Sequence, residues 1–246
     1  MSFLDQIPQE CERTVVNLHN HLASRGHTNL EANSGQFLRQ MVDLVRIASV
    51  HGRQWPIIPS VNDKPLKILE IGFNAGHSAL AFLIMPTAQV TSIDIGTHSY
   101  VLDAKAFIDN QHPLRHTLIL GDSRQALPNY VQRHEDAKFD IIFIDGGHDY
   151  ETSKSDLNNC LKMCHNDTMI IMDDVVYPQS MHEWTLGPTR AWSEAKMNKQ
   201  IDQRGLADYY PGRSMVWGVP THHRIIPSTI TSYHKEPQFL ERHWMG

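Results

Sequence analysis

The chain has 246 residues, a formal net charge of −5, and 41% hydrophobic and 20% charged residues, a composition typical of a soluble globular protein. The negative charge argues against nucleic acid as the main partner, because phosphate binding requires clustered Lys and Arg. No apolar run approaches the roughly 18 residues of a membrane span, and the first residues lack the basic and apolar regions of a signal peptide. We therefore expect a cytoplasmic protein with a small-molecule partner and no membrane contact.

The N-terminal part of the chain is expected to be helical. The segment QFLRQMVDLVRIA, residues 36–48, has the apolar spacing of an amphipathic helix, and residues 52–65 are expected to form a loop. We expect one domain over residues 1–246. In it, residues 1–65 form a helical extension that caps the site, residues 66–220 form the sheet core, and residues 221–246 form a tail.

From residue 66 onward, short apolar runs alternate with helix-like stretches. The runs are rich in Ile, Leu, Val and Phe, which is typical of strands buried on both faces of a parallel sheet. The alternation predicts a doubly wound α/β sheet with helices on both faces. Strands are expected at residues 66–71, 89–95, 115–121, 139–145 and 167–173, and helices at residues 77–85, 99–110, 123–134 and 150–164.

The rhythm changes after the fifth expected strand. Residues 187–200 are predicted to form a further helix, and residues 206–210 and 214–219 a terminal antiparallel pair around a turn-prone Pro-Gly-Arg sequence. Cys160 and Cys164 are four residues apart, which predicts that both pack on the inner face of the helix at 150–164.

The segment LEIGFNAGHS, residues 69–78, follows the first expected strand. Ligands of such sheets bind at the carboxyl ends of the strands. Gly72 and Gly76 allow a tight turn and close approach to a ligand, and the N–H groups that open the next helix attract negative charge. Asn74 stands where the dinucleotide motif G-x-G-x-x-G requires a glycine, which disfavours NAD and FAD, and no G-x-x-x-x-G-K-[ST] phosphate loop occurs.

The loop therefore favours a ligand with a nucleoside and a carboxylate but no phosphate, and S-adenosylmethionine fits this description. Glu70 would meet the ammonium group of the ligand. Gly72 and the helix start would meet its carboxylate, with Ser78 as a hydroxyl donor. Asp94, which ends the second strand, would meet the ribose hydroxyls. The alternative is that the glycines form a tight structural turn.

The sequence GDSR at residues 121–124, which ends the third strand, would lie along the edge of the adenine. Acids at several strand ends make a coincidental match to the glycine pattern hard to sustain. The residues expected to bind the cofactor are Glu70, Gly72, Asn74, Gly76, Ser78, Asp94, Asp122, Ser123, Arg124 and Asp145.

Over about residues 35–175 the sequence resembles the class I S-adenosylmethionine-dependent methyltransferases. SGQFL, residues 34–38, is similar to a GQ-containing helix of the O-methyltransferases related to the catechol, caffeoyl-CoA and sugar- and antibiotic-tailoring enzymes. FDIIFIDGGHDY, residues 139–150, matches the D-G-x-H-x-Y pattern of one branch. The resemblance implies a Rossmann-like sheet of seven strands with an antiparallel last strand, and methyl transfer to a hydroxyl of a phenol, catechol or sugar. In that family a helical N-terminal extension often serves a dimer, so the resemblance allows a homodimer.

Three acids are expected to meet at the ends of neighbouring strands. Asp145 ends the fourth strand, and Asp173 and Asp174 end the fifth. Two such charges about 4 Å apart repel by roughly 4 kcal/mol at an effective dielectric constant near 20, and a divalent cation removes that cost. Mg²⁺ suits these ligands, and Ca²⁺ or Mn²⁺ could substitute for it. Many metal-dependent family members have Asp-Asn where this chain has Asp173-Asp174. Alternatively, these two acids cap a loop or pair with Arg190.

His148 lies three residues after Asp145, at the loop position where the resemblance places a catalytic base. Because an unperturbed imidazole has a pKa near 6.5, His148 can accept a proton at neutral pH. We predict that His148 and Asp145 are catalytic; the simpler alternative is that His148 orders its loop. Other readings are a metal-independent methyltransferase for nitrogen or an acidic oxygen, a noncatalytic S-adenosylmethionine-binding protein, and, less favoured, an NAD-dependent oxidoreductase.

Overall fold

The computed structural model describes residues 3–31, 34–51, 64–134, 136–176, 182–210 and 213–221. The expected loop at 52–65 and the tail at 221–246 lie almost entirely outside these residues. None of the helices within the described ranges is both long enough and apolar enough to cross a membrane.

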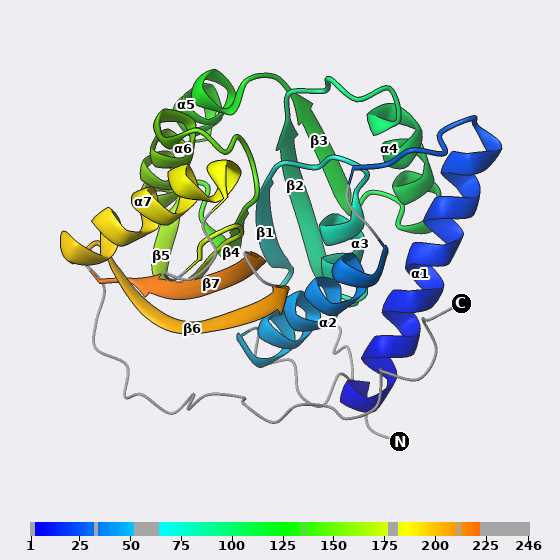
Figure 1. Ribbon diagram of the computed structural model, residues 1–246, viewed down its shortest axis with the longest axis horizontal. Coiled ribbons are helices and arrows are strands. Elements are labelled where there is room, and N and C mark those ends of the chain that lie inside the picture. The colour runs from blue at the N-terminus through cyan, green and yellow to red at the C-terminus, as the bar shows by residue number, and fades with distance from the viewer. Residues whose placement is uncertain are drawn as a thin grey trace.

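The centre of the molecule is a seven-stranded sheet with the order β3-β2-β1-β4-β5-β7-β6 (Figure 1). Strands β1 to β5 pair in parallel, whereas β7 is antiparallel to both of its neighbours. The predicted fold class is therefore confirmed, including the antiparallel last strand. The strands are β1 (Leu66–Ile71), β2 (Ala88–Asp94), β3 (His116–Leu120), β4 (Phe139–Ile144), β5 (Cys164–Met172), β6 (Ile201–Tyr210) and β7 (Arg213–Pro220).

Helices cover both faces of the sheet (Figure 1). Two separate clusters of buried side chains show this division: one joins the sheet to the first four helices, and the other joins it to the last three. The helices are α1 (Phe3–Ser24), α2 (Ser34–His51), α3 (His77–Leu83), α4 (Val101–Gln111), α5 (Ser123–Arg133), α6 (Tyr150–Lys162) and α7 (Glu183–Met197).

Neighbouring residues of a central strand pack in different clusters, one on each face of the sheet. In β1, Ile68 packs in the cluster beneath α1 to α4, and Leu69 packs in the cluster beneath α5 to α7. Both are 0% exposed. This two-sided burial explains why the strands have continuous apolar sequences, because successive side chains point to opposite faces of the sheet.

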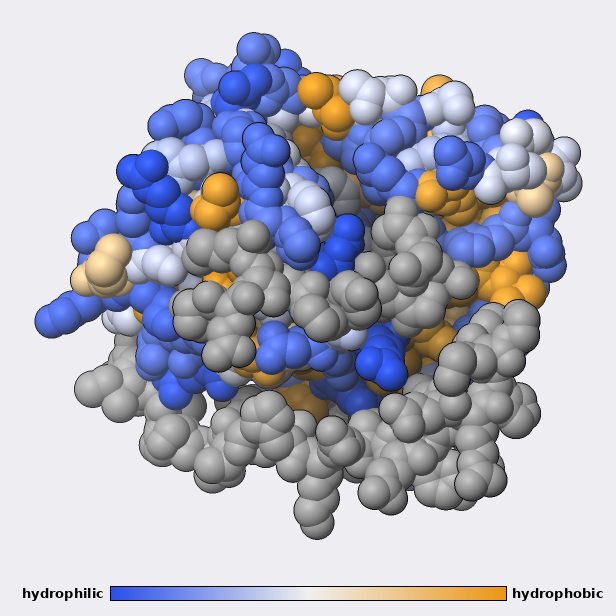
Figure 2. Space-filling model, in the orientation of Figure 1, coloured by the Kyte–Doolittle hydropathy of each residue, from blue (hydrophilic) through white to orange (hydrophobic). Residues whose placement is uncertain are grey.

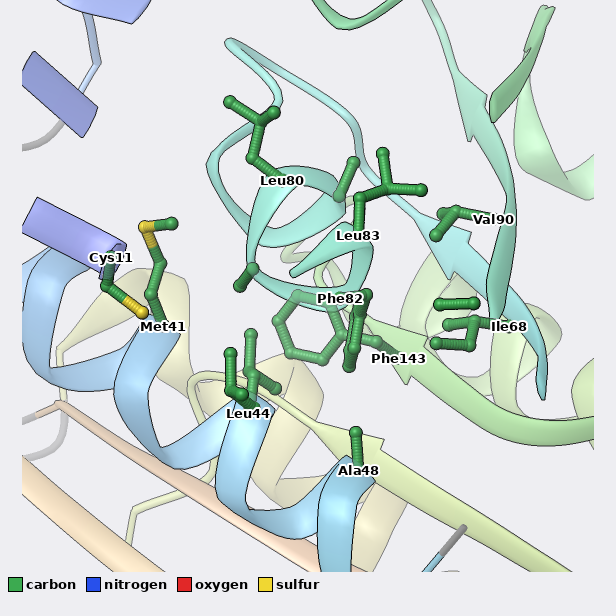
Figure 3. Close-up of a cluster of buried hydrophobic side chains, with 14 of the residues drawn as sticks. Cys11, Met41, Leu44, Ala48, Ile68, Leu80, Phe82, Leu83, Val90 and Phe143 are labelled. Atoms are coloured by element: carbon green, nitrogen blue, oxygen red, sulfur yellow. The ribbon is translucent and has the colours of Figure 1, made fainter. Parts of the chain in front are cut away.

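The first cluster also contains much of the N-terminal extension. Figure 3 shows Leu44 directed from α2 toward Phe82 of α3, with Phe143 of β4 beyond it, and Met41 of α2 beside Cys11 of α1. Along α1, apolar side chains recur every three or four residues and are at most 5% exposed: Ile7, Cys11, Val15, Leu18 and Leu22. Helix α1 is thus part of the hydrophobic core. The sequence predicted residues 1–65 as a cap over the site and did not predict this burial.

One predicted helix ends too late in the sequence. Helix α6 ends at Lys162, and Cys164 begins β5, where it pairs with Phe139 of β4. Cys160 does lie on the buried face of α6, as predicted, and Cys164 is buried as a strand residue instead. The apolar spacing alone could not separate the end of the helix from the start of the strand.

The described surface in Figure 2 is mostly hydrophilic, with apolar residues in separate patches. The polar residues that the sequence singled out come from the carboxyl ends of β1 to β5 and from the loops and helix starts that follow them. In a parallel sheet these ends share one edge, so the topology gathers the candidate site there.

Candidate active site

The glycine loop after β1 lies directly against the loop after β4. Gly72 has a φ of +91°, and a Cβ atom at this position would lie 1.8 Å from the carbonyl oxygen of Asp145. Only glycine permits both this conformation and this approach. Gly76, with a φ of +83°, immediately precedes α3. The sequence-predicted cofactor loop and Asp145 are therefore neighbours.

Glu70 and Ser78 face each other. Glu70 is fully buried, and its carboxylate accepts hydrogen bonds from the hydroxyl groups of Ser78 and Ser92. Burial raises the pKa of Glu70 to about 7, although the two serine hydroxyls oppose this effect. In this arrangement Glu70 joins β1 to α3 and β2, and its predicted contact with an ammonium group stays a prediction.

Asp94 holds the glycine loop through the backbone. One carboxylate oxygen accepts from the N–H groups of Phe73 and Asn74, at 2.8 and 2.9 Å, and the other accepts from the Gly96 N–H at 2.6 Å. A carboxylate has about four acceptor positions, so one remains for a ligand hydroxyl. Asn74 lies in the left-handed region, with a φ of +49°.

The Asn74 side chain connects the loop to the segment after α1. Its amide donates to Glu31 at 2.9 Å and accepts from the Tyr100 hydroxyl at 2.7 Å. Glu31 in turn lies 3.2 Å from His98. The segment that follows α1 thus reaches the predicted cofactor loop, although α1 itself lies in the core.

The residues predicted to lie beside the adenine are at the start of α5. Asp122 is the N-cap of this helix, and its carboxylate accepts from the Arg124 backbone N–H at 2.9 Å and from the Arg124 guanidinium at 2.6 Å. Ser123 is the first residue of the helix. Two apolar side chains at this edge were not predicted from the sequence: Ile95 is 63% exposed and Leu120 is 51% exposed. Their position beside strand-end acids was the available signal.

The loops after β4 and β5 bring a histidine and two acids together. Asp145, His148 and Asp174 each offer a ligand atom, and these atoms lie within 4.8 Å of one another. The Nε2 atom of His148 is 3.1 Å from Oδ2 of Asp174. Oδ1 of Asp174 is buried and has no hydrogen-bond partner in the described part of the chain. A buried carboxylate oxygen without a partner fits a cation ligand, because such an atom is otherwise costly.

Asp173 lies beside this group but has a different partner. The Gln40 amide of α2 donates to Oδ2 of Asp173 at 2.7 Å. Burial, followed by the Asp174 charge, raises the pKa of Asp173 to about 7. The pKa of Asp145 is also raised well above its usual value, by burial first and then by the charges of Asp173 and Asp174. Repulsion between these neighbouring acids therefore adds to the effect of burial.

Gln40 was not predicted as a site residue. It is 6% exposed and lies on the apolar face of α2, next to Met41 and one turn before Leu44. A polar residue on a buried helix face was the signal for its role. The alternative partner proposed for the acids is wrong: Arg190 pairs with Glu194 at 3.0 Å and lies over the Tyr150 ring instead.

His148 is 45% exposed and open to solvent. Its hydrogen bond with Asp174 raises its pKa, and burial opposes this effect. Since Nε2 faces Asp174, the Nδ1 atom is the ring nitrogen left for another partner. The pair can therefore accept a proton at Nδ1 while the carboxylate stabilises the imidazolium.

Comparison with known proteins agrees with this geometry. Residues 69–175 match the model of a family described as a methyltransferase domain. This segment contains the glycine loop, the strand-end acids and His148. The fold and this match confirm the resemblance to the class I S-adenosylmethionine-dependent methyltransferases.

Individual relatives are distant. Pig (Sus scrofa) catechol O-methyltransferase is 22% identical over 117 residues, which cover 47% of this chain and 63% of that enzyme, less than two thirds of its length. An O-methyltransferase from Bacillus cereus, solved with S-adenosylhomocysteine, superposes with a TM-score of 0.63 at 18% identity, covering 84% of this chain and 90% of that one. A TDP-rhamnose 3′-O-methyltransferase of calicheamicin biosynthesis superposes with a TM-score of 0.54 at 19% identity, covering 85% and 92%. At these identities the structural matches establish the fold.

Proposed function

We propose that this chain transfers the methyl group of S-adenosylmethionine to a hydroxyl group of a small molecule, a phenol, a catechol or a sugar. The observation that carries the proposal is the close approach of the Asp145 carbonyl to Gly72, which leaves no room for a Cβ atom. This approach supports the proposal because it brings the glycine loop, the predicted donor site, next to the acids and His148, the predicted acceptor site. The relatives named above that act on a catechol and on a sugar support transfer to oxygen.

The strand ends supply the contacts for the methyl donor. Asp94 has an acceptor position left for a ribose hydroxyl, while its other hydrogen bonds keep the loop in place. Ile95 and Leu120 offer apolar surface for the adenine beside the α5 start. Holding both reactants in line is the main contribution of such a site, because it removes the entropic cost of their encounter.

The acids would hold a divalent cation. Asp174, through its unpartnered Oδ1, and Asp145 fit as ligands, and Asp173 lies beside them with one oxygen bonded to Gln40. A bound cation would lower the pKa of the acceptor hydroxyl. His148 then takes the hydroxyl proton at Nδ1 and passes it to solvent, to which its ring is open.

The test is a methyl-transfer assay of the full chain with S-adenosylmethionine and a panel of phenols, catechols and sugars. We expect S-adenosylhomocysteine and a methyl ether to form, and excess EDTA to stop the reaction. Asp145→Asn should abolish turnover. The matched control is Asp109→Asn, because Asp109 lies on α4 and pairs only with Lys105 in the described structure.

Three results would contradict parts of this proposal. Absence of S-adenosylhomocysteine binding by calorimetry would remove the cofactor assignment. Full activity in excess chelator would favour the metal-independent alternative, and binding without transfer to any acceptor would favour the noncatalytic one. Methylation of amines in preference to hydroxyls would remove the assignment to oxygen.

A further inference from the structure

The start of β7 lies against the segment that leaves β5. The Val175 N–H donates to the Ser214 carbonyl at 3.2 Å, and the Ser214 hydroxyl donates to the Val175 carbonyl. Val175 directly follows Asp174. Arg213 directly precedes Ser214, so these two hydrogen bonds place it at the same edge of the sheet as the acid cluster.

The charge of Arg213 acts on several groups of the site. Burial and neighbouring carboxylates raise the pKa values of Asp145 and Asp173, and Arg213 opposes this effect on both. The Asp174 hydrogen bond raises the pKa of His148, and Arg213 opposes this effect too. Arg213 is therefore a cation that faces these three groups from the start of β7.

The Arg213 guanidinium has no protein partner within the described ranges, where no hydrogen bond or ion pair involves it. The other half-buried arginines of these ranges are paired. Arg115 donates to the Ala88 and Leu83 carbonyls at 3.0 Å, and Arg204 lies 2.8 Å from Asp202. Two of the nearby acids have other contacts, because Asp173 accepts from Gln40 and one oxygen of Asp174 faces His148.

A half-buried guanidinium with free donors is suited to a ligand. Its five N–H groups form a planar fork that matches the oxygens of a carboxylate or phosphate, which it can bind through two parallel hydrogen bonds. Carboxylate and phosphate groups are common on phenols and sugars, the acceptor classes proposed above.

We propose that Arg213 binds an anionic group, a carboxylate or a phosphate, of the acceptor molecule. Arg213 is then a specificity-determining residue: it selects acceptors that carry a negative charge at some distance from the reacting hydroxyl. This inference rests on the proposed function and narrows its substrate class.

The experiment measures binding to the full chain loaded with S-adenosylhomocysteine and magnesium. Calorimetry compares two matched pairs of probes, 3,4-dihydroxybenzoate with 3,4-dihydroxybenzamide and glucose 1-phosphate with methyl glucoside. We expect the anion of at least one pair to bind about tenfold or more tightly than its neutral partner, because hydrogen bonds to charged groups are the strong ones. The pair that responds shows whether the anion is an aromatic carboxylate or a sugar phosphate.

Arg213→Gln should abolish this preference by weakening only the anionic probe, and Arg213→Lys should restore part of it by restoring the charge. Arg204→Gln, in the same hairpin, is the matched control and should keep the preference. Equal binding of anionic and neutral probes, or a preference that survives Arg213→Gln, would overturn the inference. An equal loss for both members of a pair would also overturn it, as expected if Arg213 only balances the charge of the acids. Failure to bind S-adenosylhomocysteine would instead overturn the proposed function on which the inference rests.

Discussion

Glu70 has a fully buried carboxylate that belongs to a chain of hydrogen bonds. Ser92 donates its hydroxyl proton to Glu70, so the 2.9 Å contact between Ser92 and His116 requires His116 to donate from Nε2. Burial lowers the pKa of His116 to about 4, which keeps this imidazole neutral. The sequence predicted that Glu70 contacts the ligand. In the structure Glu70 also links β1, the strand before the glycine loop, to α3 and β2.

His148 differs from His116 because it is half-exposed and paired with an acid. We expect His148→Ala to slow methyl transfer by about 10²- to 10⁴-fold, the usual contribution of a general base, with the S-adenosylhomocysteine dissociation constant unchanged. Rate measurements and calorimetry check the two parts. An unchanged rate across the pH range would leave His148 only the role of ordering its loop.

The substitution His148→Ala should also change how the free energy of unfolding depends on pH. The pKa of His148 is raised in the folded chain. Its pairing with Asp174 therefore contributes stability that is fully present at pH values below the pKa of the unfolded chain, which is near 6.5. That contribution is lost as the pH rises through the folded value. Urea unfolding of the metal-free protein should therefore show a larger difference between wild type and His148→Ala at pH 5.5 than at pH 8.5. The opposite trend would rule out the pairing in solution.

Among the elements, the two loops that meet at Gly72 connect the cofactor site to the acids. Gly72→Ala should abolish S-adenosylhomocysteine binding, because the new methyl group would overlap the Asp145 carbonyl and push the loops apart. Overpacking of this kind costs about 1–3 kcal/mol, in addition to the strain of alanine at positive φ. Calorimetry and urea unfolding measure the two effects.

Gly26 is the matched control for this change. It has a φ of +87° but nothing within 4 Å of the position that a Cβ would take. Gly26→Ala should therefore show the backbone strain alone, about 1–2 kcal/mol, and normal S-adenosylhomocysteine binding. Equal effects of the two substitutions would mean that the close approach to Asp145 has no special importance.

At the scale of the whole molecule, the site concentrates buried negative charge where two neighbouring strands end. The pKa of Asp173 is raised from 3.8 to about 7 in the folded chain. The folded chain therefore favours the neutral form of the Asp173 carboxyl group. The contribution of this group to the free energy of unfolding is lost as the pH rises from about 4 through about 7. We expect the metal-free protein to lose stability over this range, on the order of a few kcal/mol, since one pKa unit corresponds to about 1.4 kcal/mol.

Magnesium should reverse this loss above pH 7, where the carboxylates are ionised and can act as ligands. Thermal unfolding at pH 5 and pH 8, with magnesium or EDTA, measures the effect. In Asp173→Asn both the pH-dependent loss and the response to magnesium should be smaller, whereas Asp109→Asn should behave as wild type. A magnesium shift equal at both pH values would argue against carboxylate ligation.

Much of this arrangement could be predicted from the sequence. Apolar runs between helical stretches determined the sheet, because each run is buried on both faces. Asp94, Asp122 and Asp145 could be assigned to one edge because the carboxyl ends of parallel strands coincide. The glycines of the 69–78 segment were informative for a similar reason, since a turn at a strand end limits which residues can occupy it.

Other features depended on contacts between residues far apart in the chain. Gln40 and Asp173 are 133 residues apart, and only the packing of α2 beside the strand ends brings them together. The pairing of His148 with Asp174 depends on side-chain direction within two loops, which sequence spacing does not specify. The burial of α1, and an Arg213 guanidinium without a partner among the residues that the structure describes, depended on the tertiary structure in the same way. Burial and charge pairing are properties of the assembled fold.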